Sequence, residues 1–136
     1  MFILRKVYNS GSSAAEPTTM FTTPGTAYKY GTALKVVNGK VTNAEETDMP
    51  TYIAGETLKA DEKRFMICYP ILPDMLFEVP VQGNAASVKV GSKLIMYLND
   101  GFADSLYTST EDGVATVRDT RGATKNGDTV FVSFEN

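Results

Sequence analysis

Residues that could carry out chemistry are few in this sequence of 136 residues. The chain contains no histidine and a single cysteine, Cys68. A cysteine nucleophile usually depends on a histidine base, and zinc sites need clusters of Cys or His. One cysteine also excludes an intramolecular disulfide. We therefore expect Cys68, inside the apolar run 65–69, to be a small buried hydrophobic side chain.

Acidic side chains occur in groups, but each group lies in a stretch that is typical of a turn. The groups are Glu45 with Glu46 and Asp48, Asp100 with Asp104, and Glu111 with Asp112. General acid–base catalysis needs two carboxyl groups in different environments, one of them sheltered. Asn99-Asp100-Gly101 also lacks the ligand spacing of a calcium loop. We expect these acids to be solvated, and we predict neither a metal site nor an enzyme.

Two further patterns match binding motifs only in part. Gly91-Ser92-Lys93 looks like the end of a phosphate-binding loop, but Ala86 replaces the earlier glycine and a strand-like run follows. Tyr28 and Tyr30 are two residues apart and would share one face of a strand. There they could stack on a base or ligand, or pack across the sheet, and we favour packing. The sequence predicts no cofactor.

The charge pattern limits the partners. The chain has 13 Lys and Arg residues and 16 Asp and Glu residues, which gives a net charge of -3, and it has no long basic tract. Nucleic-acid-binding domains concentrate positive charge, so we expect no nucleic-acid partner. The apolar start 1–4 precedes its basic residues, the reverse of a signal peptide, and no apolar run approaches the roughly 20 residues that span a bilayer. We expect no membrane partner and a cytoplasmic protein, or one on a particle assembled there.

From Tyr28 onward the elements that must position these residues are short strands. Asn38-Gly39 between two runs of β-formers predicts a type I′ hairpin. Pro80 cannot donate a backbone hydrogen bond, so it predicts an edge or a bulge within 75–81. Further strands are predicted near 52–53, 64–69, 86–90, 93–98, 113–118 and 129–134. Short strands with turns every 8 to 12 residues are typical of a small all-β barrel or sandwich.

Residues 1–27 have a different composition. Small polar residues, two prolines and two glycines give no helix or strand period there. We interpret 1–27 as an extended N-terminal arm before a β domain of 28–136; the alternative is an edge strand and surface loop of that domain. Such an arm would be ordered mainly by what it lies against. Its apolar residues are thus the predicted partner contacts: Phe2, Ile3, Leu4, Met20 and Phe21.

The last third of the chain resembles the closing strands of head decoration (capsid cement) proteins of tailed bacteriophages. The resemblance covers about 50 residues and rests on three segments: Val88-Lys89-Val90-Gly91-Ser92-Lys93-Leu94, Gly113-Val114-Ala115-Thr116-Val117 and Gly127-Asp128-Thr129-Val130-Phe131-Val132. It implies a β-barrel or β-tulip with an N-terminal arm, frequently a trimer. It also implies a protein made in the host cytoplasm that docks on the major capsid protein at the surface of the virion.

Three functions follow as hypotheses. The first, implied by the resemblance, is a virion structural protein that binds the outside of an assembled capsid and stabilises it. Its arm would add a strand to a partner's sheet, so deleting 1–27 should abolish docking and leave the barrel folded. The alternative is a carbohydrate- or ligand-binding β module of a phage fibre or adhesin. An enzyme with an unrecognised carboxylate site is third.

Overall fold

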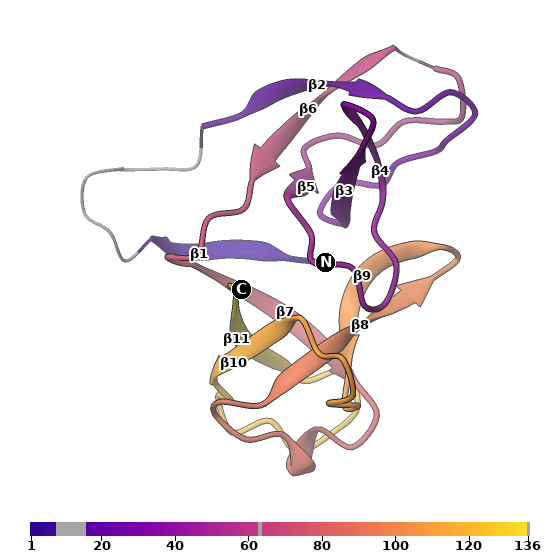
Figure 1. Ribbon diagram of the computed structural model, residues 1–136. Helices are drawn as coiled ribbons and strands as arrows, with labels where there is room; N and C mark the ends of the chain where they lie inside the picture. Colours follow the sequence, from indigo (N-terminus) through magenta and orange to yellow (C-terminus); the bar gives the residue numbers. More distant parts are fainter. Residues whose placement is uncertain (8–15, 63, 136) are drawn as a thin grey trace.

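The computed structural model describes residues 1–7, 16–62 and 64–135, and its regular structure is almost entirely β-strand (Figure 1). Strands from the first half of the chain close a barrel in the order β2-β4-β3-β5-β6, which we call the upper barrel after its place in Figure 1. Its strands are β2 (Thr18–Thr22), β3 (Ala33–Val37), β4 (Lys40–Asn43), β5 (Tyr52–Ala54) and β6 (Phe65–Pro70).

The second half forms the lower barrel, in the order β7-β11-β10-β8-β9, which a parallel pairing of β7 with β9 closes. Its strands are β7 (Met75–Gln82), β8 (Lys93–Asn99), β9 (Phe102–Tyr107), β10 (Ala115–Asp119) and β11 (Thr129–Phe134), with a 3₁₀ turn at Ala85–Ser87. The predicted all-β barrel class is confirmed, with two barrels in place of one. The strand expected at 86–90 is replaced by the 3₁₀ turn, and β9 has no counterpart among the expected strands.

Tight turns behave as the sequence predicts. Asn38 and Gly39 have φ angles of 52° and 78°, the left-handed conformation that a type I′ turn needs at both central positions. Asp100 and Gly101, with φ angles of 50° and 85°, connect β8 to β9 in the same way. These turns fix the registers of the hairpins β3–β4 and β8–β9.

Pro80 lies in a central strand, at the point where β7 changes partners. On one side β7 pairs with β11 from Phe77 to Pro80. On the other side it pairs with β1 (Ile3–Val7) as far as Glu78 and with β9 from Val81. The Val81 N–H donates to Asp128 on the β11 side, so the nitrogen of Pro80 is directed to the opposite side. The N–H that Pro80 lacks would therefore point between β1, which ends its pairing at Glu78, and β9, which begins its pairing at Val81.

The described part of residues 1–27 belongs to the barrels. β1 lies antiparallel to β7 and pairs Leu4 with Phe77, while β2 pairs with β6 and β4 inside the upper barrel. The strands are thus grouped as 18–70 and as 3–7 with 75–134, which differs from the expected division into 1–27 and 28–136. β1 and β2 are each ordered by strands far along the chain, and a local sequence pattern does not reveal such partners. Residues 8–15 of the expected arm lie outside the described residues.

Two hydrophobic clusters fill the molecule. One lies inside the upper barrel; its buried members are Tyr28, Leu34, Val41, Ala54, Leu58, Met66 and Cys68. The other fills the lower barrel and continues across the joint to include Phe2, Ala33, Ala44 and Ile53. Phe2 packs edge-on against Phe134, with 5.5 Å between ring centroids. Because the second cluster crosses the joint, part of the upper barrel packs into the core of the lower barrel.

Backbone and charged groups also cross the joint. The Phe2 N–H donates to the Gly31 carbonyl (2.8 Å), and the Met96 N–H donates to the Glu46 carbonyl (2.9 Å). Lys29 of the upper barrel lies 3.8 Å from the Asp104 carboxylate of the lower barrel. These contacts fix how the barrels sit on one another.

Candidate interaction surface

Of the acidic groups singled out in the sequence, that of Asp48 stabilises a turn, whereas Asp104 lies within strand β9 and not in a loop as expected. Asp48 accepts a hydrogen bond from the Glu45 N–H (2.8 Å) and pairs with Lys35 at 2.8 Å. The hydrogen bond from Lys35, followed by that from the Glu45 N–H, lowers the pKa of Asp48. Within residues 1–7, 16–62 and 64–135, no three Cys, Asp or Glu side chains gather as a metal site would require.

No helix of the described chain is long and apolar enough to cross a membrane.

Cys68 faces the interior of the upper barrel and is fully buried, as predicted. Burial, with a smaller contribution from the charge of Glu56, raises the pKa of its thiol to about 12. A thiol in this state is almost never ionised at neutral pH and is a poor nucleophile. Cys68 is therefore a core residue.

Tyr28 and Tyr30 do not share a face. Tyr28 is buried in the upper barrel, where its hydroxyl donates to the Val41 carbonyl (2.5 Å) and accepts from the Thr23 N–H (2.9 Å). Tyr30 is half exposed. Residues 28–30 lie outside the regular strands, since only Tyr28 forms an isolated bridge, to Leu58. The two-tyrosine platform considered in the sequence is not formed.

The five predicted partner contacts have different surroundings. Phe2 is buried in the joint, so it cannot meet a partner without unfolding. Leu4 packs against the lower core and Met20 against the upper core, and Ile3 is half-buried. Phe21 alone of the five is mainly exposed, with 59% of its surface accessible. The partner role stays a prediction for Ile3, Leu4, Met20 and Phe21, and the burial of Phe2 argues against it there.

Phe21 belongs to a row of exposed side chains that crosses four strands of the upper barrel. It is the cross-strand partner of Phe65 in β6 on one side and of Lys40 in β4 on the other. Lys40 is in turn opposite Val37 of β3. Phe65 is 55% exposed and Val37 46%, and Ile67, two residues beyond Phe65, is 44% exposed. We call Phe21, Val37, Phe65 and Ile67 the Phe21 face.

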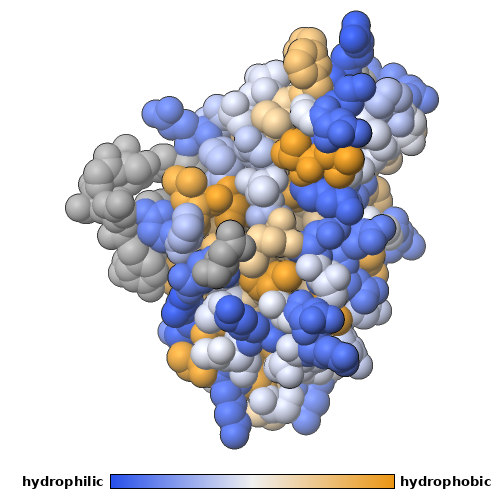
Figure 2. Space-filling view, viewed as in Figure 1, coloured by the Kyte–Doolittle hydropathy of each residue, from blue (hydrophilic) through white to orange (hydrophobic). Residues whose placement is uncertain are grey.

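β2 and β6 lie along the top of the molecule in Figure 1, away from the lower barrel. Figure 2 shows hydrophobic side chains exposed among hydrophilic ones on the upper barrel in this view. Gly55 leaves room beside Ile67, because a Cβ at this glycine would stand 2.8 Å from the Ile67 carbonyl oxygen. Glycine is thus required for the close approach of the chain to β6, and it adds no side chain over Ile67.

Two unpaired cations border the Phe21 face. Lys40 lies within the row and Arg64 directly precedes Phe65; both are exposed, and neither has an ion-pair partner among the described residues. Acids of the adjoining turn bond to backbone N–H groups, as Asp61 does to Gly25 (2.6 Å) and Glu62 to Lys59 (2.7 Å). Lys40 and Arg64 therefore keep free donors for a partner.

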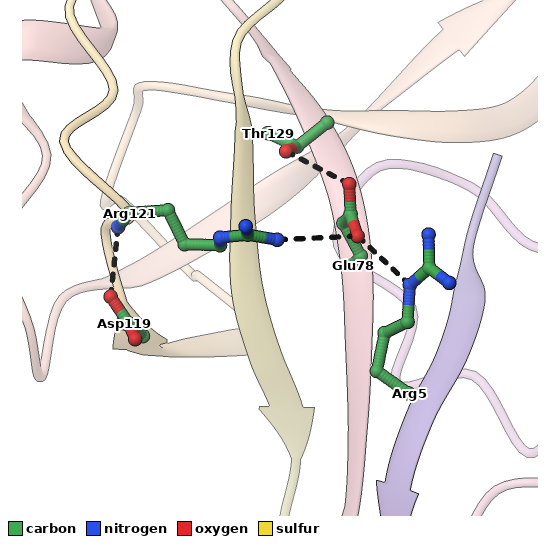
Figure 3. Close-up of polar contacts among 5 residues, drawn as sticks. All are labelled: Arg5, Glu78, Asp119, Arg121 and Thr129. Carbon is green, nitrogen blue, oxygen red and sulfur yellow. Dashed lines mark hydrogen bonds and ion pairs between the residues drawn. The ribbon is translucent and has the colours of Figure 1, made fainter.

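Glu78 anchors a second polar cluster, on the lower barrel (Figure 3). One carboxylate oxygen accepts from Arg5 Nε (2.9 Å) and lies 3.4 Å from Arg121 Nη1, and the other accepts from Thr129 (3.0 Å). The Arg121 guanidinium lies 4.5 Å from the centre of the Phe131 ring. Burial raises the pKa of Glu78, but hydrogen bonds from Thr129 and Arg5 and the charges of both arginines leave it below its ordinary value. Through the Arg5 contact, this cluster fastens β1 to β7.

Tyr97 and Tyr107 form an exposed aromatic pair on β8 and β9. Their ring centroids are 6.1 Å apart with 30° between the planes, and they are 38% and 42% exposed. Two tilted rings side by side offer faces on which a sugar or another planar group could stack.

Comparison with known proteins gives one line of evidence on this fold. No family model and no curated protein matches the sequence. Among solved structures, the chain is similar to the head fibre gp8.5 N base of bacteriophage phi29, with a TM-score of 0.56 and 14% sequence identity. The likeness covers 88% of this chain and 95% of that one, so it includes most of both barrels. At this identity it establishes a shared fold.

Proposed function

We propose that this protein is a non-enzymatic structural component of a bacteriophage virion, attached to the outside of the head. The likeness to a phage head fibre base, over 88% of the chain, is the observation that carries the proposal. A fold alone does not determine function, so the surface must agree with it. Asp48 caps a turn and Cys68 fills the core, while an apolar face lies open beside two cations that have no ion-pair partner in the described part of the chain.

In its finer form, the proposal is that the protein decorates and cements the capsid through contacts with the major capsid protein, and self-associates as a trimer. The resemblance of residues 88–132 to decoration proteins supports cementing. A fibre base is the other structural role, since the neighbour in fold is one. Both roles require specific attachment to the head, and they differ in whether attachment strengthens it.

Co-sedimentation with purified heads of the phage that encodes the chain tests the proposal. We expect saturable binding at a simple ratio of copies to capsid subunits. A cement protein would also raise the temperature at which filled heads release DNA, whereas a fibre base would bind and leave it unchanged. Absence of saturable binding would overturn the proposed function.

A carbohydrate-binding module is the second candidate, and the Tyr97–Tyr107 pair favours it. The chain has no tryptophan, so its intrinsic fluorescence comes from tyrosine. Titration with a panel of glycans should change that emission if a sugar stacks on this pair, and Tyr97→Ala should abolish the change. No change with any glycan would remove this candidate.

A further inference from the structure

We infer that the Phe21 face is the surface through which this protein attaches, and that its partner is an acidic protein surface with an apolar patch, belonging to a different protein. The inference deepens the proposed function and rests on it for where the partner is sought.

The exposed area is that of the largest apolar patch of a typical monomer, and it is too small for a complete interface. The four exposed fractions, 59%, 46%, 55% and 44%, together amount to roughly 300–400 Å² of side-chain surface. The largest apolar patch of a monomer is about 300–600 Å² and is often functional. A standard interface buries about 800 Å² on each side. The face thus suits the apolar centre of a contact that polar groups complete.

Charge argues against a second copy of this chain as the occupant. In a two-fold dimer the same patch meets itself, so Lys40 and Arg64 of one copy would approach those of the other. Like charges at an interface oppose association, whereas carboxylates opposite these cations would favour it. Their unused donors therefore point to an acidic partner.

A nucleic acid fits less well. Exposed Phe side chains beside Lys and Arg could stack on bases, but Val37 and Ile67 offer branched aliphatic groups with no ring. The chain as a whole carries a net charge of -3, which repels phosphates. An apolar patch on a protein can pack against all four side chains of the Phe21 face.

At Phe21 the strand β2 is paired on both sides, with Phe65 of β6 and with Lys40 of β4. Strand addition is therefore blocked at Phe21, where a partner must be contacted by side chains. Phe21 and Phe65 are held opposite one another by the ladder, so little order is lost when a partner docks.

Co-sedimentation of point variants with purified heads tests the inference. Phe21→Ser and Phe65→Ser should each weaken binding at least tenfold, while Val90→Ser, which removes an equally exposed apolar side chain from the lower barrel, should leave it unchanged. Lys40→Glu and Arg64→Glu should also weaken binding, and the remaining affinity should depend less on salt. Thermal unfolding of every variant checks that both barrels stay folded.

The outcomes separate the two proposals. If the unchanged protein does not bind heads, the proposed function fails and the inference falls with it. If the protein binds and Phe21→Ser binds equally well, only the inference is overturned. Self-association in analytical ultracentrifugation that Phe21→Ser abolishes would assign the face to a second copy, and binding of a labelled thymidine oligonucleotide lost in the same variant would assign it to nucleic acid. Either result would overturn the partner proposed.

Discussion

Tyr28 shows how one buried hydroxyl can hold a loop onto a barrel. It accepts a hydrogen bond from the Thr23 N–H, and the Val41 carbonyl to which it donates also accepts from Thr23 Oγ1. Tyr28→Phe keeps the ring but removes both hydrogen bonds of the hydroxyl, and it leaves the Thr23 N–H only its longer bond to the Val41 carbonyl (3.3 Å). We therefore expect a loss of about 1–3 kcal/mol in the free energy of unfolding. Urea denaturation measures the loss. Tyr30→Phe, at a half-exposed position, is the control and should change stability by less than about 0.5 kcal/mol.

The Cys68 thiol makes the upper barrel's integrity measurable. With its pKa raised to about 12 and no exposed surface, it should not react with a disulfide reagent in the folded protein at pH 8. In urea we expect one equivalent to react within minutes. Rapid reaction without denaturant would mean that the barrel opens readily, contrary to its closed strand order.

At the scale of elements, the Glu78 cluster predicts how pH acts on β1. Since the pKa of Glu78 is lowered in the folded state, its stabilisation is complete above about pH 4.3 and is lost as pH falls through the folded-state value. Glu78→Gln should cost about 1 kcal/mol at pH 7, a modest figure because both arginines are half exposed and solvent screens them. The cost should disappear near pH 2.

Urea denaturation at pH 7 and pH 2 compares the variant with the unchanged protein. Glu111→Gln, at an exposed position, serves as the matched control and should give no difference at either pH. An equal cost of Glu78→Gln at both pH values would show that packing of the side chain, and not its charge, matters.

Local elements could be predicted from sequence, and distant pairings could not. The Asn38-Gly39 hairpin and the strand at 129–134 follow from turn chemistry and alternation within a few residues. β1 has only five residues and pairs with a strand 73 positions away, and β2 is equally short. Nothing within such segments says what they lie against, so an arm and an edge strand give the same pattern.

From the Phe21 face, the sequence pattern identified Phe21 alone as a contact, for a related reason. The run 65–69 is apolar on both faces, which is typical of a strand buried on both sides. Within the run 65–69, Met66 and Cys68 are the residues that face into the upper barrel, so Phe65 and Ile67 lie on its outside. An excess of apolar residues on a strand of a single-layer barrel is the signal that could have revealed them.

At the scale of the whole molecule, the cluster that crosses the joint predicts one unfolding transition for two barrels. Phe2, Ala33 and Ile53 belong to the same cluster as the interior of the lower barrel, so loss of that core also exposes residues of the upper barrel. Calorimetry should give equal calorimetric and van't Hoff enthalpies. Phe2→Ala should cost about 3–5 kcal/mol and lower the single transition. Two separate transitions in the unchanged protein would contradict this prediction.

The position of Phe2 and β1 also changes how truncation must be read. Deleting 1–27 would remove Phe2 from the joint and β2 from the upper barrel, so loss of docking after that deletion would report unfolding. Point changes at exposed positions separate attachment from stability, which is why the Phe21 face is tested by single substitutions.

The pairing of β1 with β7 has a consequence during synthesis on the ribosome. The upper barrel, residues 18–70, can close as soon as it leaves the exit tunnel, because all five of its strands are contiguous in the chain. β1 emerges first but must wait for Phe77, 73 positions after Leu4, which takes about 4–15 s at ordinary elongation rates. During that interval Phe2, Ile3 and Leu4 are exposed on the nascent chain, where a chaperone or a neighbouring chain can bind them. The lower barrel then closes last, and β1, which pairs with its strand β7, is made before any strand of that barrel.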